Sequence, residues 1–347
     1  MSRQVMSSQE NLKESNAITT WQKLLEMISG YWVSQSIYAA AELGIADLLK
    51  DGPQHIDQLA QAVEADVQSL YRLMRGLASV GVFIEVENRH FRMTPIGEHL
   101  QTGNPNSLRF LALLFGKEQY QAWDDIVYSV RSGKCAYEHQ NGTSFFHYLE
   151  QDVEAAQTFN QAMMNFLQQI PISVADAYDF SGFNKIVDVG GGHGNLISSI
   201  LKANPLIRGV LFDVPHVIEG AQKHTAGLSE RCELVTGDFF KSVPSDGDAY
   251  ILSTIIHDWD DGSSIAILKN CHDAMVKDGK LLLVEMVIPP GNDPFFGKLL
   301  DLHMLVMHGG RERTEAEYRT LLAKAGFKLT NIITTKSLRS VIEAVRV

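Results

Sequence analysis

The spacing of apolar and polar positions divides the chain into regions with different periods. From Trp21 to about Gly103, apolar residues recur three or four positions apart, as in helices that bury one side. The pattern stays helical and rich in aromatic residues over 104–178. Beyond it, short apolar runs alternate with helical stretches, which predicts parallel strands joined by helices. We therefore expect a flexible N-terminus (1–16), an N-terminal domain (17–103), a helical linker that contributes to a substrate pocket (104–178) and an α/β domain (179–347).

The α/β domain begins with five apolar runs that predict strands. They lie at 185–189, 209–212, 233–236, 249–253 and 280–285. Helical patterns separate them, so the predicted sheet is parallel and doubly wound. Two further runs, 329–334 and 340–345, are joined by a short polar link. This spacing predicts an antiparallel hairpin at the C-terminal edge of the sheet.

The N-terminal domain has the pattern of a winged helix. Two helical stretches, 56–63 and 67–77, precede two short apolar runs at 80–84 and 91–93. A winged helix can bind DNA, but the segment 66–79 offers only two cations, and DNA binding depends on phosphate contacts. The apolar residues around Trp32 exceed what so small a domain can bury, which favours a homodimer interface.

Composition excludes several classes of partner. The chain has 347 residues, 45% hydrophobic and 20% charged, and a net charge of −11. Because nucleic acids and anionic membranes need a basic face, we expect neither as a partner. No run approaches the roughly 20 apolar residues that span a bilayer, and the first 16 residues do not resemble a secretory signal. Three scattered cysteines fit a reducing compartment, so we expect a cytoplasmic protein.

A glycine cluster after the first strand predicts a nucleoside cofactor. Asp188 is followed by glycines at 190, 192 and 194, which let backbone approach a ligand at the start of a helix. A dinucleotide motif needs a further small residue, but that position is Asn195. Asp188, two residues before the first glycine of the cluster, also suits an ammonium group better than a pyrophosphate. These departures favour S-adenosylmethionine, with S-adenosylhomocysteine as product.

The carboxyl ends of the other strands supply further candidates, since ligands of an open parallel sheet bind there. Asp213 suits ribose hydroxyls, and Asp238 with Phe239 suits adenine. His257 follows the fourth strand and is our candidate general base, because imidazole accepts protons near neutral pH. Either Glu285 or Glu312 is placed to orient this histidine, as the acid of a catalytic triad does.

Five motifs in a fixed order resemble the caffeate/hydroxyindole type of S-adenosylmethionine-dependent O-methyltransferases, in its bacterial branch. They are Val-Asp-Val-Gly-Gly-Gly-His-Gly (187–194), Phe-Asp-Val-Pro-His-Val (212–217), Gly-Asp-Phe-Phe (237–240), His-Asp-Trp (257–259) and Gly-Gly-Arg-Glu-Arg-Thr (309–314). The resemblance runs from about Trp21 to the C-terminus. It implies a winged-helix dimerisation domain followed by a Rossmann-like class I methyltransferase domain.

The resemblance also implies roles for individual residues. Gly190 and Gly192 approach the methionine part of the cofactor, and His257 is the base with Glu285 and Glu312 beside it. Asp301 and Met304 fall where this family lines the acceptor pocket; Met163 is our own further candidate. Plant members often carry a lysine four residues before the catalytic histidine, where this chain has Ser253. We expect Ser253 to lie at the cofactor edge and the cofactor to be held differently there.

The expected reaction is methyl transfer to a phenolic or enolic hydroxyl of a small, aromatic secondary metabolite. One alternative is a metal-dependent C-methyltransferase of an α-keto acid, in which His257 and His303 or His308 hold the metal. In the preferred hypothesis, O-methyl transfer with His257 as the base, no metal takes part. A second alternative, from another class, is a non-enzymatic regulator built on the winged helix.

Overall fold

The computed structural model describes residues 19–347, which form two compact units divided between Lys117 and Glu118. The predicted flexible segment 1–16 lies outside the described residues. The limits at 103 and 178 that the sequence suggested remain predictions. Each unit is described by itself below.

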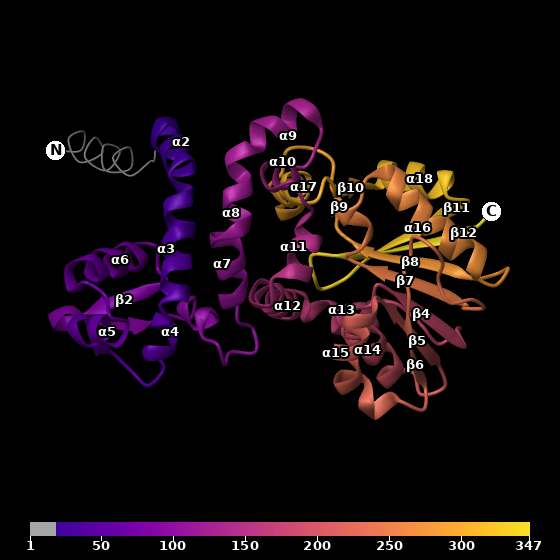
Figure 1. Cartoon of the computed structure of the whole chain (residues 1–347), viewed down its shortest axis with the longest axis horizontal. Helices are drawn as coiled ribbons and strands as arrows, with labels where there is room; N and C mark the ends of the chain where they lie inside the picture. Colours follow the sequence, from indigo (N-terminus) through magenta and orange to yellow (C-terminus); the bar gives the residue numbers. More distant parts are fainter. Residues whose placement is uncertain (1–18) are drawn as a thin grey trace, which may run out of the picture. The chain divides into compact units, whose positions relative to one another are not determined.

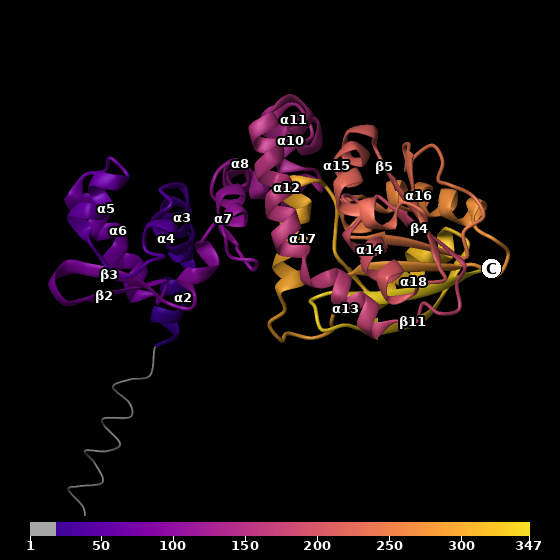
Figure 2. The same ribbon diagram turned by 90° about the horizontal axis from the view of Figure 1, so that it is seen from below.

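The first unit is a winged helix preceded by two helices (Figures 1 and 2). Its three-stranded sheet has the order β1-β3-β2, and Phe83–Val86 pairs antiparallel with His90–Met93. Leu59, Met74 and Phe91 lie fully buried in its core. The elements in chain order are α2 (Thr20–Ile28), α3 (Gly30–Glu42), α4 (Ile45–Leu48), β1 (Gln54–His55), α5 (Ile56–Ala62), α6 (Val67–Ser79), β2 (Phe83–Val86), η1 (Glu87–Arg89), β3 (His90–Met93), η2 (Gly97–Leu100) and α7 (Arg109–Gly116).

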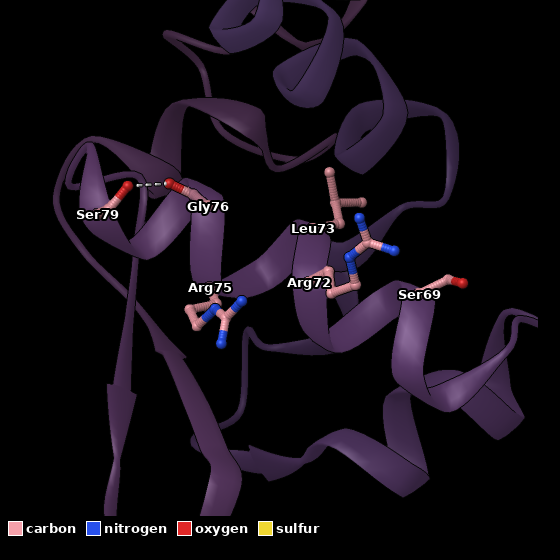
Figure 3. A pocket seen from close by; sticks show the side chains of 6 residues that line it. All are labelled: Ser69, Arg72, Leu73, Arg75, Gly76 and Ser79. Carbon is pink, nitrogen blue, oxygen red and sulfur yellow. Dashed lines mark hydrogen bonds between the residues drawn. The ribbon is translucent and has the colours of Figure 1, made fainter.

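Helix α6 takes the place of a recognition helix in this winged helix. Asp66 caps it by accepting a hydrogen bond from the amide of Ser69 at 2.8 Å. Its outer face borders a shallow hollow of about 550 Å³, in which Arg72 and Arg75 occupy successive turns (Figure 3). No acidic residue lies within α6, but two cations are few for a phosphate-binding surface.

Helices α2 and α3 carry an apolar surface that the first unit leaves exposed. None of the residues of α2 is buried. Leu24 and Ile28, one helical turn apart, are 57% and 64% exposed, and Trp32 of α3 is 61% exposed. A continuous apolar patch of this kind marks an interface with a partner.

The second unit begins with helices and ends in a seven-stranded sheet. The helical elements are α8 (Glu118–Ala122), η3 (Trp123–Asp125), α9 (Ile126–Ser132), α10 (Ala136–Asn141), α11 (Phe145–Gln151), α12 (Val153–Leu167) and α13 (Gln169–Ala177). The sheet order is β11-β12-β8-β7-β4-β5-β6. Strands β4 to β8 are parallel, and β12 pairs antiparallel with both β8 and β11.

The strands match the predicted runs closely. They are β4 (Lys185–Val189), β5 (Arg208–Asp213), β6 (Cys232–Thr236), β7 (Ala249–Ser253), β8 (Lys280–Glu285), β11 (Phe327–Thr334) and β12 (Ser340–Arg346). The predicted doubly wound sheet with a C-terminal antiparallel hairpin is confirmed. A short parallel pair, β9 (Val287–Ile288) with β10 (Arg313–Thr314), lies outside this sheet.

Helices cover both faces of the sheet (Figure 1). On one face, α16 (Asp261–Ala274) and α18 (Glu315–Lys324) pack against side chains such as Val187 and Leu283. On the other, α13, α14 (Asn195–Ala203) and α15 (Pro215–Thr225) pack against neighbours such as Ile186 and Leu282. Successive strand residues point to opposite faces, so a strand buried on both faces must be apolar throughout. The continuous apolar runs of the sequence reflect this burial.

The remaining helical elements connect these parts. They are η4 (Ala226–Leu228), η5 (Ile256–Asp258) and α17 (Phe296–Met307). Within the part of the chain that the structure describes, we find no helix with the length and apolar character to cross a membrane.

We predict that the double substitution Leu24→Glu/Ile28→Glu disrupts self-association. Both side chains project from the exposed apolar side of α2, and four buried carboxylates in a two-fold interface would repel one another. Sedimentation velocity should show monomers, whereas the single substitution Lys23→Glu on the same helix should leave the wild-type state unchanged. A dimer that survives the double substitution would place the interface elsewhere.

Candidate active site

Polar residues from several strands gather at one edge of the sheet. Asp188 lies near the end of β4, Asp213 ends β5, Ser253 ends β7 and Glu285 ends β8. Asp238 follows β6 by two residues. Because these strands are parallel, their carboxyl ends lie at the same edge, where an open sheet of this kind binds its ligands.

The loop after β4 brings bare backbone into this edge. Gly190 and Gly192 both have positive φ, at 68° and 60°, which side chains rarely tolerate. A Cβ atom on Gly190 would also lie 2.6 Å from the Ile255 side chain and 3.6 Å from the ring of Phe239. Glycine at 190 is therefore required both by conformation and by close approach, and Phe239 lies next to the glycine loop.

Asp188 is a buried carboxylate that lacks a side-chain partner. Both of its carboxylate oxygens are buried without a hydrogen bond to any residue that the structure describes. Burial raises the pKa of Asp188 to about 7, the backbone amide of Ile197 opposes the rise, and the neighbouring Asp213 adds to it. Such a group is costly unless something pairs with it. An ammonium group, such as that of a methionine moiety, fits this requirement.

Asp213 is held at the same loop by backbone hydrogen bonds. Its carboxylate accepts from the amide of Gly192 at 2.9 Å and from that of Val214 at 2.7 Å. Burial raises the pKa of Asp213 above its usual value, although these two hydrogen bonds oppose the rise. Each oxygen keeps a further lone pair, so the carboxylate can still accept from ribose hydroxyls.

Asp238 and Phe239 follow β6, the outermost of the parallel strands on this side of the sheet. The carboxylate of Asp238 accepts from the amide of Phe240 at 2.9 Å and pairs with Lys241 at 3.3 Å. The half-buried Phe239 ring lies 5.0 Å from Phe240 and 6.1 Å from Trp259. This aromatic group offers a face on which a flat base can stack. Ser253 is half-buried at the end of β7.

His257 lies on η5 and is hydrogen-bonded to a buried glutamate. Its Nδ1 lies 2.8 Å from Oε1 of Glu312, which is 1% exposed. Glu285 acts on the same segment differently, because its Oε1 accepts from the backbone amides of Ile255 and Ile256 at 3.0 and 2.9 Å. Each of the three contributes an atom to a group that spans no more than 4.8 Å.

The charges around His257 favour its protonated form. Burial alone lowers the pKa of the imidazole, but the carboxylates of Asp258, Glu285 and Glu312 outweigh burial and raise it to about 9. Asp258 contributes at close range, with Oδ1 3.5 Å from Nε2 of His257. Burial in turn raises the pKa of Glu285 to about 7, against the effect of His257. The cluster therefore stabilises an imidazolium after proton uptake.

The segment 309–314 docks directly against the backbone of His257. The amide of Arg311 donates to the carbonyl of His257 at 2.8 Å. Gly310 permits this approach, because a Cβ there would collide with the His257 carbonyl oxygen. Fully buried Arg313 donates to the carbonyls of Ile256 and Trp259, each at 3.0 Å. The Gly-Gly-Arg-Glu-Arg-Thr motif thus holds the segment around His257 through hydrogen bonds to its backbone.

The three residues predicted for the acceptor pocket occupy different settings. Asp301, on α17, accepts from the amide of Glu312 at 2.9 Å and so supports the partner of His257. Met304 is buried on the same helix and packs with Met286 and Leu300. Met163 lies half-buried on α12 and takes no part in the hydrogen-bonded cluster.

His303 and His308, the histidines proposed for the metal-dependent alternative, contact other side chains of the protein. His303 Nδ1 accepts from Trp123 Nε1 at 3.1 Å, which leaves its Nε2–H to donate to Gln119 at 3.1 Å. The His308 ring stacks on Phe146 with 4.9 Å between centroids. Burial lowers the pKa of these imidazoles to about 4 and about 3. These contacts and the lowered pKa values indicate that both histidines are neutral and packed within the protein. The group of possible metal ligands around His257 contains, besides this histidine, only the carboxylates Glu285 and Glu312 among the described residues.

Sequence reasoning missed several residues at this edge. Asp258 adjoins His257, but we assigned it no role from the sequence. Arg313 sits within a motif that we quoted without giving this side chain a role. Arg339 precedes β12 and is 4% exposed. The pairing of β12 with β8 brings Arg339 near Glu285. The local sequence pattern does not predict this pairing.

The fold and the site together define a class I methyltransferase: a doubly wound sheet with a C-terminal hairpin, a glycine loop beside a buried aspartate, and a buried histidine just past the fourth strand. Comparison with known proteins supports this class. Residues 123–328 match the model of the O-methyltransferase domain, and residues 25–103 match that of the O-methyltransferase dimerisation domain.

Individual relatives of the chain are also methyltransferases. A phenazine O-methyltransferase of Lysobacter antibioticus is 50% identical over 92% of this chain and 95% of its own length. A 3-amino-4-hydroxybenzoate 4-O-methyltransferase of Streptomyces cremeus is 40% identical over 91% and 87%. An O-methyltransferase of neocarzinostatin biosynthesis, solved with S-adenosylmethionine and 2-hydroxy-5-methyl naphthoic acid, is 31% identical, has a TM-score of 0.81 and covers 90% of this chain and 96% of its own.

The chain belongs to the O-methyltransferase family. It is a methyltransferase that uses S-adenosylmethionine, and its first unit contains the dimerisation domain through which it forms a homodimer. The family assignment confirms the predicted methyltransferase and not the alternative of a non-enzymatic regulator.

We predict that Gly310→Ala lowers both stability and activity. The added methyl group must push the 309–314 segment away from His257, and overpacking of this kind costs about 1–3 kcal/mol. Thermal unfolding and turnover should both show the change. Gly182→Ala is the matched control, because a Cβ there meets nothing within 4 Å. Equal effects of the two substitutions would contradict the docking described above.

Proposed function

We propose that the protein methylates a hydroxyl group of a small aromatic metabolite and that His257 is the general base. The observation that carries this proposal is the buried hydrogen bond between His257 Nδ1 and Glu312. A methyltransferase that acted on a neutral nitrogen would have less need of such a base. A hydroxyl acceptor must lose a proton during the reaction, and a histidine held by a carboxylate is suited to take it.

The residues of β4 to β7 are proposed to hold the cofactor. Asp188 would pair with the ammonium of the methionine part, and the backbone of Gly190 and Gly192 would lie along it. Asp213 would accept from the ribose hydroxyls. Asp238 and Phe239 would hold adenine, the first by a hydrogen bond and the second by stacking. Ser253 would lie at the cofactor edge. The orphaned buried carboxylate of Asp188 gives the strongest support.

The bound cofactor supplies a methyl group that its sulfonium has already activated. The protein must then align the acceptor and remove its proton. Nδ1 of His257 faces Glu312, so Nε2, which lies 3.5 Å from Oδ1 of Asp258, is the nitrogen that accepts the hydroxyl proton when the imidazole is neutral. Because the pKa of His257 is raised to about 9, the neutral fraction and the rate of proton removal should increase as the pH rises toward that value. Glu312 stabilises the imidazolium that forms, and Glu285 fixes the backbone of the segment that carries it. Alignment contributes up to about 7–11 kcal/mol in well-oriented reactions, and a general base adds about 10²–10⁴-fold.

The acceptor is proposed to be a flat ring system. The relatives described above act on a phenazine, on a hydroxybenzoate or bind a naphthoic acid, and each of these is aromatic. Met304 and Met163 are proposed acceptor contacts, since flexible thioethers adapt to apolar rings. Asp301 is proposed to act through Glu312, whose amide it binds.

The other elements of the proposal concern domains and compartment. We propose that residues 17–103 form the dimerisation domain, that 104–178 link it to the catalytic part and contribute to the acceptor pocket, and that 179–347 bind the cofactor. We also propose a cytoplasmic location. The three cysteines are free and buried, as expected of a protein from a reducing compartment.

We predict that His257→Ala reduces turnover by about 10²–10⁴-fold, because the general base is lost. Binding of S-adenosylhomocysteine, measured by calorimetry, should change little, since His257 is not among the proposed cofactor contacts. His147→Ala is the control: it removes an exposed histidine paired with Glu150. A His257→Ala variant that methylates at the wild-type rate would show that the base assignment is wrong.

The acceptor class is tested with radiolabelled S-adenosylmethionine and a panel of hydroxylated benzenes, naphthalenes and phenazines, with keto acids included. Methyl transfer to a ring hydroxyl supports the proposal. Transfer only to carbon of a keto acid, abolished by a chelator and restored by metal, would favour the metal-dependent alternative instead.

A further inference from the structure

A buried arginine at the edge of the site forms no close ion pair with any described residue, although the charges of Glu285, Glu312 and Asp258 act on it. Arg339 is 4% exposed. Its Nε is buried without a hydrogen bond, and no ion pair between described residues includes it. Burying a guanidinium costs free energy unless hydrogen bonds or an opposite charge compensate. The unpaired Nε–H of Arg339 can therefore donate to a ligand.

The backbone of Arg339 is fixed, so its side chain starts from a defined position. Its amide donates to Ser337 Oγ at 3.2 Å, and its carbonyl accepts from Thr335 Oγ1 at 2.6 Å. The next residue, Ser340, is the register partner of Glu285 in the pairing of β12 with β8. Arg339 therefore enters the site from the strand beside the one that ends at Glu285.

Aromatic rings lie near the guanidinium in addition to the carboxylates. Its central carbon lies 6.0 Å from the centroid of the Phe166 ring on α12. Phe166 in turn contacts Phe296 at the start of α17, with centroids 6.5 Å apart. These two helices also carry Met163 and Met304. An arginine beside aromatic rings suits the binding of a flat anion, because the guanidinium plane can stack and donate at once.

Strand order separates Arg339 from the proposed cofactor contacts. Those contacts lie on β4, β5 and β6 and the loops that follow them, whereas Arg339 precedes β12 on the far side of β7 and β8. Neighbouring strands are about 4.8 Å apart, so β12 lies about 14 Å from β4 across the sheet. His257 and Glu285, which follow or end β7 and β8, lie between the two. By strand order, Arg339 therefore lies on the side of His257 that faces away from the proposed cofactor contacts.

We propose that Arg339 binds a carboxylate on the aromatic acceptor and so selects acidic acceptors. The inference rests on the proposed function and adds the chemical class of the substrate. Two N–H groups of a guanidinium match the two oxygens of a carboxylate, which fixes orientation as well as charge. The anchored ring would then present its hydroxyl to His257. Burial lowers the pKa of Arg339 below its usual value, and the charges of nearby Glu285, Glu312 and Asp258 oppose this fall.

The test compares acids with their neutral amides. Benzoate, 1-naphthoate and phenazine-1-carboxylate, each beside its primary amide, are titrated by calorimetry into the full-length protein saturated with S-adenosylhomocysteine. In the wild type we expect at least one acid to bind about 10- to 100-fold more tightly than its amide, as for a charge-assisted hydrogen bond. Arg339→Met, which keeps the aliphatic packing on Phe166, should abolish the difference without weakening the amide.

Control variants keep the result interpretable. Arg319→Met removes an exposed arginine that pairs with Glu315, and should leave the preference for acids intact. Arg339→Lys keeps the charge but loses the fork, and should retain only part of the preference. If Arg339→Met does not fold, this lysine variant decides the question alone, and an undiminished preference in it would overturn the proposal.

Several outcomes would contradict the inference. Equal affinity of the wild type for acids and amides, or no binding of any acid, would exclude a carboxylate site. Weaker binding of S-adenosylhomocysteine itself to Arg339→Met would assign the arginine to the cofactor carboxylate. A shifted pH profile with no loss of acid preference would make Arg339 a positioning residue for Glu285. Methylation of neutral phenols by the wild type would leave the proposed function standing in all three cases.

Discussion

The site depends on the hydrogen bond between His257 and Glu312 inside the protein. The two groups lie 2.8 Å apart, and neither is more than 8% exposed. In such surroundings an unpaired charge would be expensive, so imidazolium and carboxylate stabilise each other. The same hydrogen bond fixes Nδ1 toward Glu312 and leaves Nε2 as the other ring nitrogen. The orientation and tautomer of the histidine therefore depend on this interaction, whereas its proton affinity also depends on Asp258 and Glu285.

The rest of the second unit holds this interaction in place. The partners are 55 residues apart and come from different elements, so the fold must bring them together. Glu285 binds the amides before His257, Arg313 binds the carbonyls on either side of it, and Asp301 binds the amide of Glu312. Gly310 allows the two segments to touch. Each contact uses backbone, which explains why the geometry is rigid although the site lies on loops.

Much of the fold could be predicted because burial leaves a clear pattern in the sequence. The runs at 185–189, 249–253 and 280–285 coincide with β4, β7 and β8, since a strand buried on both faces is apolar throughout. The gathering of Asp188, Asp213 and Glu285 followed from parallel topology. Other features could not be predicted from local pattern. The choice of Glu312 as the partner of His257, the backbone role of Glu285, and the position of Arg339 all depend on how distant segments dock.

The most direct test is an NMR titration of the His257 imidazole in ¹⁵N-histidine-labelled protein. The account predicts a hydrogen-bonded Nδ1–H and a pKa of about 9, because the surrounding carboxylates raise it. The imidazolium should therefore persist until the pH rises through that value, and Glu312→Gln should lower the pKa. An imidazole with the ordinary pKa of histidine, unchanged in Glu312→Gln, would contradict the account.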